Sequence, residues 1–281
     1  MAQQAAINPF VEVQKSTRAP VFVFDHGLGD FIHYLPVHLE FERQTQMNIT
    51  LASSRSRQFS KLYSKVIDAE DITPRTYGFI YRVFYPDTKS FVVPFEIYDE
   101  PSKPYLCAYY ELGMSPFIWT PYRMIMPRER LKRIGVHFFG HTGCKEKFCS
   151  NPVAKMIWEE IIEAGYEPFE CHMRPDLRAR YQDSGDDSCD FIPESQTIRY
   201  QKPDLQLMKD EIAKCKYFIG VDSGPLYLAS SILGHENIIG LENKKRIAYY
   251  CPKHISTVSI KEYQPGTIYQ RIKLLEGQSH A

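Results

Sequence analysis

The strongest constraint on this chain is a pattern that occurs twice: a short apolar run enters a turn rich in glycine and aspartate, and an amphipathic segment follows. Residues 26–30 (His-Gly-Leu-Gly-Asp) follow the apolar run 21–24, and residues 221–225 (Val-Asp-Ser-Gly-Pro) follow the run 217–220. A buried strand, a glycine turn and a helix together form a mononucleotide-binding unit. Two such units predict two α/β domains that face each other across a central cleft.

Length and composition allow two domains of ordinary size. The 281 residues are 43% hydrophobic and 14% aromatic, which is enough to fill two cores. Strand and helix patterns alternate before and after a proline-rich, basic stretch at residues 113–133. We therefore place the domain boundary there, with domains at residues 1–125 and 126–281. The basic residues of this stretch either face the cleft and attract an anion or solvate a linker.

The charge balance excludes a global electrostatic field. Thirty-four basic residues match 34 acidic ones, so we expect no nucleic-acid partner. No apolar stretch approaches the ~20 residues of a membrane helix, and the N-terminus has no signal-peptide pattern. We expect a cytoplasmic protein with at most peripheral membrane contact. The seven cysteines form no CxxC pair and no common zinc spacing, which favours reduced thiols and no metal.

Local patterns predict several element boundaries. Apolar residues have helical spacing over residues 53–67, and a second helix is expected at residues 152–164, with Asn151 as its N-cap and Gly165 beyond its end. Residues 174–201 lack apolar periodicity and are rich in aspartate, which predicts a solvated loop.

The turn at residues 221–225 suits a phosphate. A strand that enters a helix through a glycine turn directs backbone N–H groups and the positive end of the helix dipole at one point. Ser223 adds a hydroxyl, Gly224 allows close approach, and Pro225 fits the start of a helix, where an N–H would lack a partner. A tight connection with Asp222 as a capping residue explains this turn alone equally well.

The turn at residues 26–30 differs from a dinucleotide-binding fingerprint. Ile32 stands where the third glycine belongs, and no acidic residue follows about 20 residues later to hold a ribose. A nicotinamide or flavin enzyme is therefore disfavoured. Asp30 lies at the expected helix start, close to His26 and His33, where a carboxylate can pair with the helix dipole or act as a general base.

Three segments in this order resemble the heptosyltransferase-like glycosyltransferases of family 9. Residues 29–36 (Gly-Asp-Phe-Ile-His-Tyr-Leu-Pro) are similar to the N-terminal Gly-Asp…Leu-Pro motif of that family. Residues 219–229 are similar to its Gly-Val-Asp-Ser/Thr-Gly-x-x-His-Leu-Ala motif. A weaker similarity to its Lys-Trp-Pro…Trp stretch involves Lys147, Phe148, Pro152 and Trp158.

The resemblance implies a GT-B fold, in which the N-terminal of two Rossmann-like α/β domains binds the acceptor and the C-terminal domain binds a nucleotide-diphosphate sugar. It implies inverting transfer of a heptose-like sugar, with an ADP-sugar favoured as donor, to a saccharide or glycolipid acceptor, without a metal or other cofactor. Asp30 matches the base of the family, and Lys147 matches a phosphate-contacting lysine, with Lys145 as an alternative. The implied donor-binding residues are Lys147, Asp222, Ser223, Gly224, Pro225 and Tyr227. The residues expected in the acceptor-side loop are His26, Gly27, Gly29 and His33.

Two departures from the family pattern leave other functions open. Tyr227 replaces the family's histidine and cannot carry a positive charge near neutral pH. The N-terminal domain is also small for this fold. A noncatalytic nucleotide-sugar-binding module of the same fold is one alternative, and a nucleotide-sugar epimerase is another.

Overall fold

In a computed structural model, the chain forms two compact units, Met1–Tyr122 and Arg123–Ala281. The residues that the structure describes are 20–24, 27–72, 79–82, 115, 122–126, 130–140, 148–172, 189–202, 204–242 and 256–278. None of the helices within these ranges combines the length and apolar character that a membrane crossing requires.

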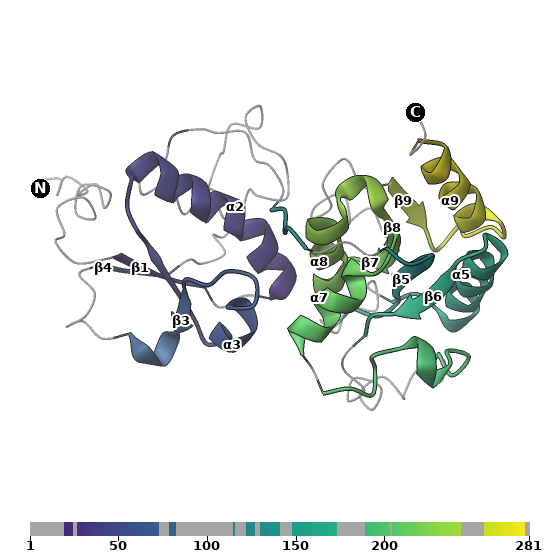
Figure 1. Ribbon diagram of the computed structural model, residues 1–281, viewed down its shortest axis with the longest axis horizontal. Coiled ribbons are helices and arrows are strands. Elements are labelled where there is room, and N and C mark those ends of the chain that lie inside the picture. Colours follow the sequence, from purple (N-terminus) through teal and green to yellow (C-terminus); the bar gives the residue numbers. More distant parts are fainter. Residues whose placement is uncertain are drawn as a thin grey trace, which may run out of the picture. The chain divides into compact units, whose positions relative to one another are not determined.

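A parallel sheet with the strand order β3-β2-β1-β4 organises the first unit (Figure 1). Its strands are β1 (Pro20–Val23), β2 (Thr50–Ser53), β3 (Val66–Asp68) and β4 (Phe79–Arg82). Parallel partners flank β1 on both sides, with β2 on one edge and β4 on the other. The order of the strands therefore reverses beside β1, as in a Rossmann-like sheet.

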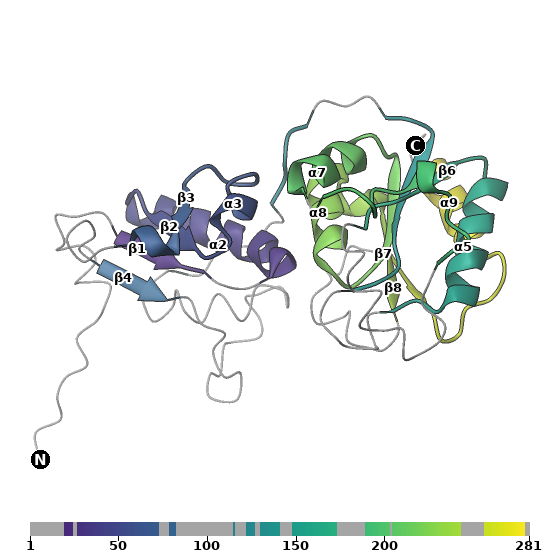
Figure 2. The same cartoon turned by 90° about the horizontal axis from the view of Figure 1, so that it is seen from below.

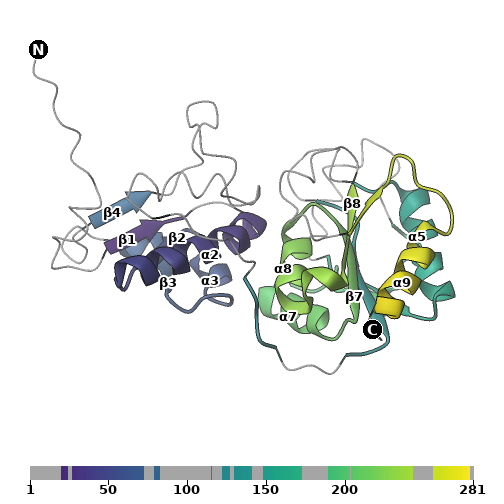
Figure 3. The same cartoon turned by 90° about the horizontal axis from the view of Figure 1, so that it is seen from above.

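The two faces of β1 bury different side chains, because strand residues alternate in direction. Phe22 packs against Phe41 of α2 (Leu28–Thr45), with ring centroids 5.6 Å apart. On the opposite face, Val21 and Val23 form a small cluster with Ala52. Among the described helices of this unit, α2 and α3 (Ser56–Phe59) lie on one face of its sheet (Figure 3). A 3-10 turn, η1, spans Ala69–Asp71.

The second unit contains a five-stranded parallel sheet in the order β6-β5-β7-β8-β9. Its strands are β5 (Arg133–His137), β6 (Glu167–Glu170), β7 (Tyr217–Val221), β8 (Ile238–Glu242) and β9 (Ser256–Ser259). Every residue of β7 is buried, which explains why this strand is apolar without alternation.

Helices cover both faces of this sheet, with α7 and α8 on one face and α5 and α9 on the other (Figure 2). Because parallel crossovers are right-handed, the reversal of strand order at β5 sends α5 to one face and α7 and α8 to the other. The helices are α5 (Asn151–Glu163), α7 (Leu205–Ala213), α8 (Gly224–Leu233) and α9 (Thr267–Gln278). Two 3-10 turns, η5 (Glu194–Gln196) and η6 (His235–Asn237), lie between them.

The prediction of a helix at residues 53–67 is wrong. Only one helical turn, α3, forms there, and Val66 and Ile67 belong to β3, where they pair in parallel with Leu51 and Ala52. Strand pairing satisfies the backbone of this segment and buries Val66, so tertiary contacts override the local helical spacing.

The helix predicted at residues 152–164 forms as α5, but its N-cap is Ser150 rather than Asn151. The Asn151 side chain instead accepts a hydrogen bond from the Cys189 N–H at 3.1 Å. Gly165 has a φ of +84°, the left-handed conformation that ends helices, so its predicted role is confirmed.

Part of the loop predicted to be solvated is buried. Within residues 174–201, the structure describes residues 189–201, where Arg199 is only 5% exposed. The Arg199 Nε donates to a Glu170 carboxylate oxygen at 3.0 Å, and the Thr197 hydroxyl donates to the same oxygen at 2.6 Å. The buried ion pair between Arg199 and Glu170 thus holds residues 197–199 against the end of β6. Its partners lie far apart in sequence, so no local pattern indicates it.

The cysteines that the structure describes are free thiols, as predicted. They are Cys149, Cys171, Cys189 and Cys215, and all are buried. Burial raises the pKa of Cys215 to about 12, which keeps this thiol protonated and unreactive near neutral pH. Cys107, Cys144 and Cys251 lie outside the described residues.

Candidate functional site

The carboxyl ends of β5 and β7 meet where the strand order of the second unit reverses. β6 lies on one side of β5 and β7 on the other, so the chain leaves these two central strands toward opposite faces of the sheet. Ligands of open parallel α/β sheets bind outside the carboxyl ends of the strands at such a switch point. Here the switch point is formed by the residues after His137 in β5 and by the turn at Asp222 after β7.

The turn after β7 leaves the start of α8 without a side-chain cap among the described residues. Ser223 is the N-cap residue, yet its hydroxyl donates back to the Val221 carbonyl oxygen at 3.1 Å. The first turn of α8 contains no acidic residue, and Pro225 lies in it as predicted. The helix's own residues therefore place no acidic side chain at the positive end of the α8 dipole, which favours a bound anion. The Asp222 carboxylate, one residue before the cap, is engaged by the Tyr227 hydroxyl.

Asp222 and Tyr227 hold each other across this turn. The Tyr227 hydroxyl donates to the Asp222 carboxylate, and the two residues are 7% and 5% exposed. A buried carboxylate requires a hydrogen bond to offset its lost hydration. The predicted donor-binding residues Asp222, Ser223, Gly224, Pro225 and Tyr227 thus lie together at one turn.

A pair of buried histidines lies at the neighbouring strand ends. The ring centroids of His137 and His172 are 5.4 Å apart, and the His137 Nδ1 donates to the Cys171 carbonyl oxygen at 3.2 Å. Burial, together with the nearby His172, lowers the pKa of His137 to about 3, so the ring is neutral near pH 7. The bond ties the end of β5 to the end of β6. The position of His137 at the end of β5, and of His172 two residues after β6, is the sequence signal that indicates this switch point.

Lys147 and the alternative Lys145 lie outside the described residues. The residues that flank their loop are described. Phe139 and Phe148 form an isolated antiparallel bridge, and their ring centroids are 6.0 Å apart. The loop therefore starts and ends beside the carboxyl end of β5.

In the first unit, Asp30 lies in the first turn of α2, which begins at Leu28, two residues before the predicted start. Its carboxylate accepts a hydrogen bond from the Gly27 N–H at 3.2 Å, so the helix carries its own acidic cap. His33 is 4% exposed, Gly29 lies within the first turn, and His26 lies outside the described residues.

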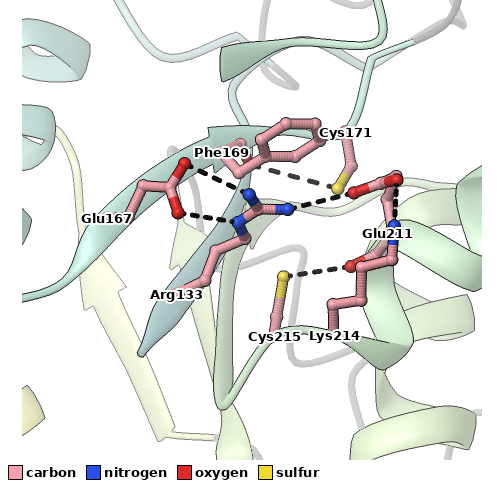
Figure 4. A network of polar contacts seen from close by, with 7 residues as sticks. All are labelled: Arg133, Glu167, Phe169, Cys171, Glu211, Lys214 and Cys215. Carbon is pink, nitrogen blue, oxygen red and sulfur yellow. Dashed lines mark hydrogen bonds and ion pairs between the residues drawn. The ribbon is translucent and has the colours of Figure 1, made fainter. Parts of the chain in front are cut away.

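Arg133, the last residue of the basic stretch at residues 113–133, does not lie at the switch point. Arg133 is the first residue of β5, at the amino edge of the sheet, and binds Glu167 and Glu211 through contacts of 3.0 to 3.1 Å (Figure 4). Its guanidinium also lies over the Phe169 ring, 4.3 Å from the centroid. This arginine joins β5, β6 and α7, so the alternative in which it attracts an anion is wrong for Arg133.

No metal centre is found in the described part of the chain, where no three His, Cys, Asp or Glu side chains gather closely enough to hold an ion. Independence from metals remains a prediction, since His141 and Cys144 are not described.

Comparison with known proteins gives matches by structure. No protein-family model matches the sequence, and no curated protein matches it by sequence. The ADP-heptose LPS heptosyltransferase II of E. coli is similar with a TM-score of 0.67 and 13% identity, over 94% of this chain and 100% of that one. A family 9 glycosyltransferase from Veillonella parvula gives a TM-score of 0.59 at 14% identity, over 92% and 96% of the two chains.

This chain has the GT-B fold of the heptosyltransferases. The predicted fold class and the resemblance to family 9 are confirmed at the level of the fold. The iron-containing dodecameric glycosyltransferase TibC of enterotoxigenic E. coli is also similar, with a TM-score of 0.60 and 16% identity over 86% of this chain. The chain spans 62% of the length of TibC.

Proposed function

We propose that the protein is an inverting glycosyltransferase that moves a heptose-like sugar from an ADP-sugar to a hydroxyl group of a saccharide or glycolipid. The observation that carries this proposal is the uncapped start of α8 at the switch point of a heptosyltransferase fold. Related structures support the choice of nucleotide, because TibC has been solved with ADP-D-β-D-heptose and WaaC of E. coli with ADP.

The second unit is the proposed donor-binding half. The turn from Asp222 to Gly224 binds the diphosphate through its backbone N–H groups, with Pro225 at the start of α8, and the helix dipole offsets the charge. Lys147 supplies further positive charge to the departing nucleotide diphosphate. This assignment requires neither a metal nor another cofactor.

The first unit is the proposed acceptor-binding half, with Asp30 as the base. The acceptor hydroxyl oxygen forms a bond to the anomeric carbon while the bond from that carbon to the diphosphate oxygen breaks. The hydroxyl proton moves to the Asp30 carboxylate, and the nucleoside diphosphate leaves with the bonding electrons. His26, Gly27, Gly29 and His33 are the proposed loop residues around this base. We also propose a cytoplasmic location, where nucleotide sugars are available.

The test is a transfer assay with the full chain, in which ADP-, UDP- and GDP-sugars are supplied with a panel of saccharide acceptors. We expect nucleoside diphosphate release that depends on an acceptor and is fastest with an ADP-heptose. Release at the same rate without acceptor would instead indicate a hydrolase, and a changed sugar still attached to its nucleotide would indicate an epimerase. No binding and no release with any of the three nucleotides would remove the proposed function.

A noncatalytic nucleotide-sugar-binding module is the second candidate. One observation favours it: the Asp30 carboxylate already caps α2 through the Gly27 N–H, and this structural role accounts for the residue without catalysis. Calorimetric binding of ADP without sugar release from any donor would support this second candidate.

A further inference from the structure

The contact between Asp222 and Tyr227 joins two defined positions of α8. Ser223 is the N-cap, so Asp222 is the residue before the cap and Tyr227 is the fourth residue of the helix. In many helices an apolar pair at these two positions, the hydrophobic staple, fixes the angle at which the chain enters the helix. Here a hydrogen bond from a phenol to a carboxylate joins the same positions.

The local chemistry makes this contact important for the turn. Ser223 does not brace the helix start, because its hydroxyl donates to Val221 in the preceding strand. The Leu226 and Tyr227 N–H groups both donate to the Ser223 carbonyl oxygen, at 3.1 and 3.4 Å. The hydrogen bond from Tyr227 to Asp222 adds a side-chain link between the residue before the cap and the first turns of the helix. Both partners are nearly buried, and a hydrogen bond to a charged group is stronger than one between neutral groups.

We propose that Tyr227 is a positioning residue: through Asp222 it acts as a polar staple that fixes the turn from Asp222 to Gly224 in the geometry that binds a diphosphate. Tyr227 thus serves the donor without contacting it, since its hydroxyl is bonded to the carboxylate. This inference rests on the proposed function, because it assigns a role within the same donor-binding turn.

The experiment is a double-mutant cycle on the full chain, with ADP binding measured by calorimetry for the wild type, Tyr227→Phe, Asp222→Ala and the double variant. We expect each single variant to weaken binding about tenfold. The double variant should bind no more weakly than Asp222→Ala alone, because the phenol has lost the group through which it acts. If Asp222→Ala does not fold in thermal unfolding, Asp222→Asn takes its place in the cycle.

The matched control is Tyr217→Phe, which removes a second buried tyrosine hydroxyl from the same strand–turn–helix segment, at the amino end of β7. Its affinity for ADP should equal that of the wild type. A tyrosine that contacts the diphosphate directly would give losses that add in the double variant, and this result overturns the positioning role. If the wild type binds none of ADP, UDP and GDP, the proposed function is wrong, and the positioning role of Tyr227 is wrong as well because it depends on that function.

Discussion

The two units begin their sites with the same backbone pattern, but the carboxylates beside the two helix starts have different partners. In the first unit, α2 starts with its own carboxylate, because Asp30 accepts a hydrogen bond from the Gly27 N–H. In the second unit, the first turn of α8 has no acidic residue, and the Ser223 hydroxyl turns back to the strand. The same backbone pattern is therefore proposed to bind a phosphate in the second unit only. The proposed difference is that the carboxylate of α2 accepts a hydrogen bond from the backbone at the helix start, whereas that of Asp222 accepts one from the Tyr227 side chain.

The largest expected effect concerns the carboxylate that distinguishes α2. Asp30→Asn should lower the transfer rate by about 10²- to 10⁴-fold, because the amide cannot take up the acceptor proton. ADP affinity, measured by calorimetry, should stay unchanged, since the diphosphate belongs to the other unit. Glu40→Gln, at an acid of the same helix that pairs with Arg43, is the control and should retain activity. Normal turnover by Asp30→Asn would reduce Asp30 to a helix cap.

A second comparison concerns the interiors, because each unit buries a neutral histidine. Burial lowers the pKa of both His38 and His137 from 6.5 to about 3. Between these values the unfolded chain binds protons that the folded chain does not, so stability must fall as the pH falls. From about pH 7 to pH 5 we expect a loss of about 2 kcal/mol per histidine, measured as a lower urea midpoint.

Single variants separate the two contributions to this pH dependence. His38→Gln should reduce the loss of stability of the first unit between pH 7 and pH 5. In the wild type, the ring nitrogen of His38 lies 3.3 Å from the Tyr34 hydroxyl. His137→Gln should reduce the same loss of stability in the second unit. A wild-type midpoint that does not change between the two pH values would show that neither histidine is buried in its neutral form.

The smallest effect tests the uncapped start of α8 directly. Gly224→Asp gives α8 the first-turn carboxylate that α2 already has. ADP affinity should fall about tenfold through repulsion between like charges. The melting temperature should not fall, because an acidic residue in the first turn stabilises a helix. Gly277→Asp in α9, where an added side chain meets nothing within 4 Å, is the matched control. Unchanged affinity in Gly224→Asp would move the diphosphate away from this helix.

Much of the second unit could be predicted from the sequence, because its elements carry strong local signals. The apolar strand β7, the proline at the start of α8 and the helix end at Gly234, with a φ of +98°, all lie where their residue types predict. The same local reasoning failed at residues 53–67, where helical spacing competes with a strand pairing that depends on β2, about 15 residues earlier in the chain.

The sequence by itself determined the two α/β units, the strand–turn–helix segments and the residue types available at each turn, because these depend on short-range periodicity and turn chemistry. Tertiary structure decided which of these residues work together. The Ser223 hydroxyl donates to the Val221 carbonyl oxygen instead of capping α8. His137 and His172 are neighbours only because β5 pairs with β6. Arg133 lies at the amino edge of the sheet, where it binds Glu211, and not at the candidate site. Hydrogen bonds between residues distant in sequence depend on strand order and register, which no single segment encodes.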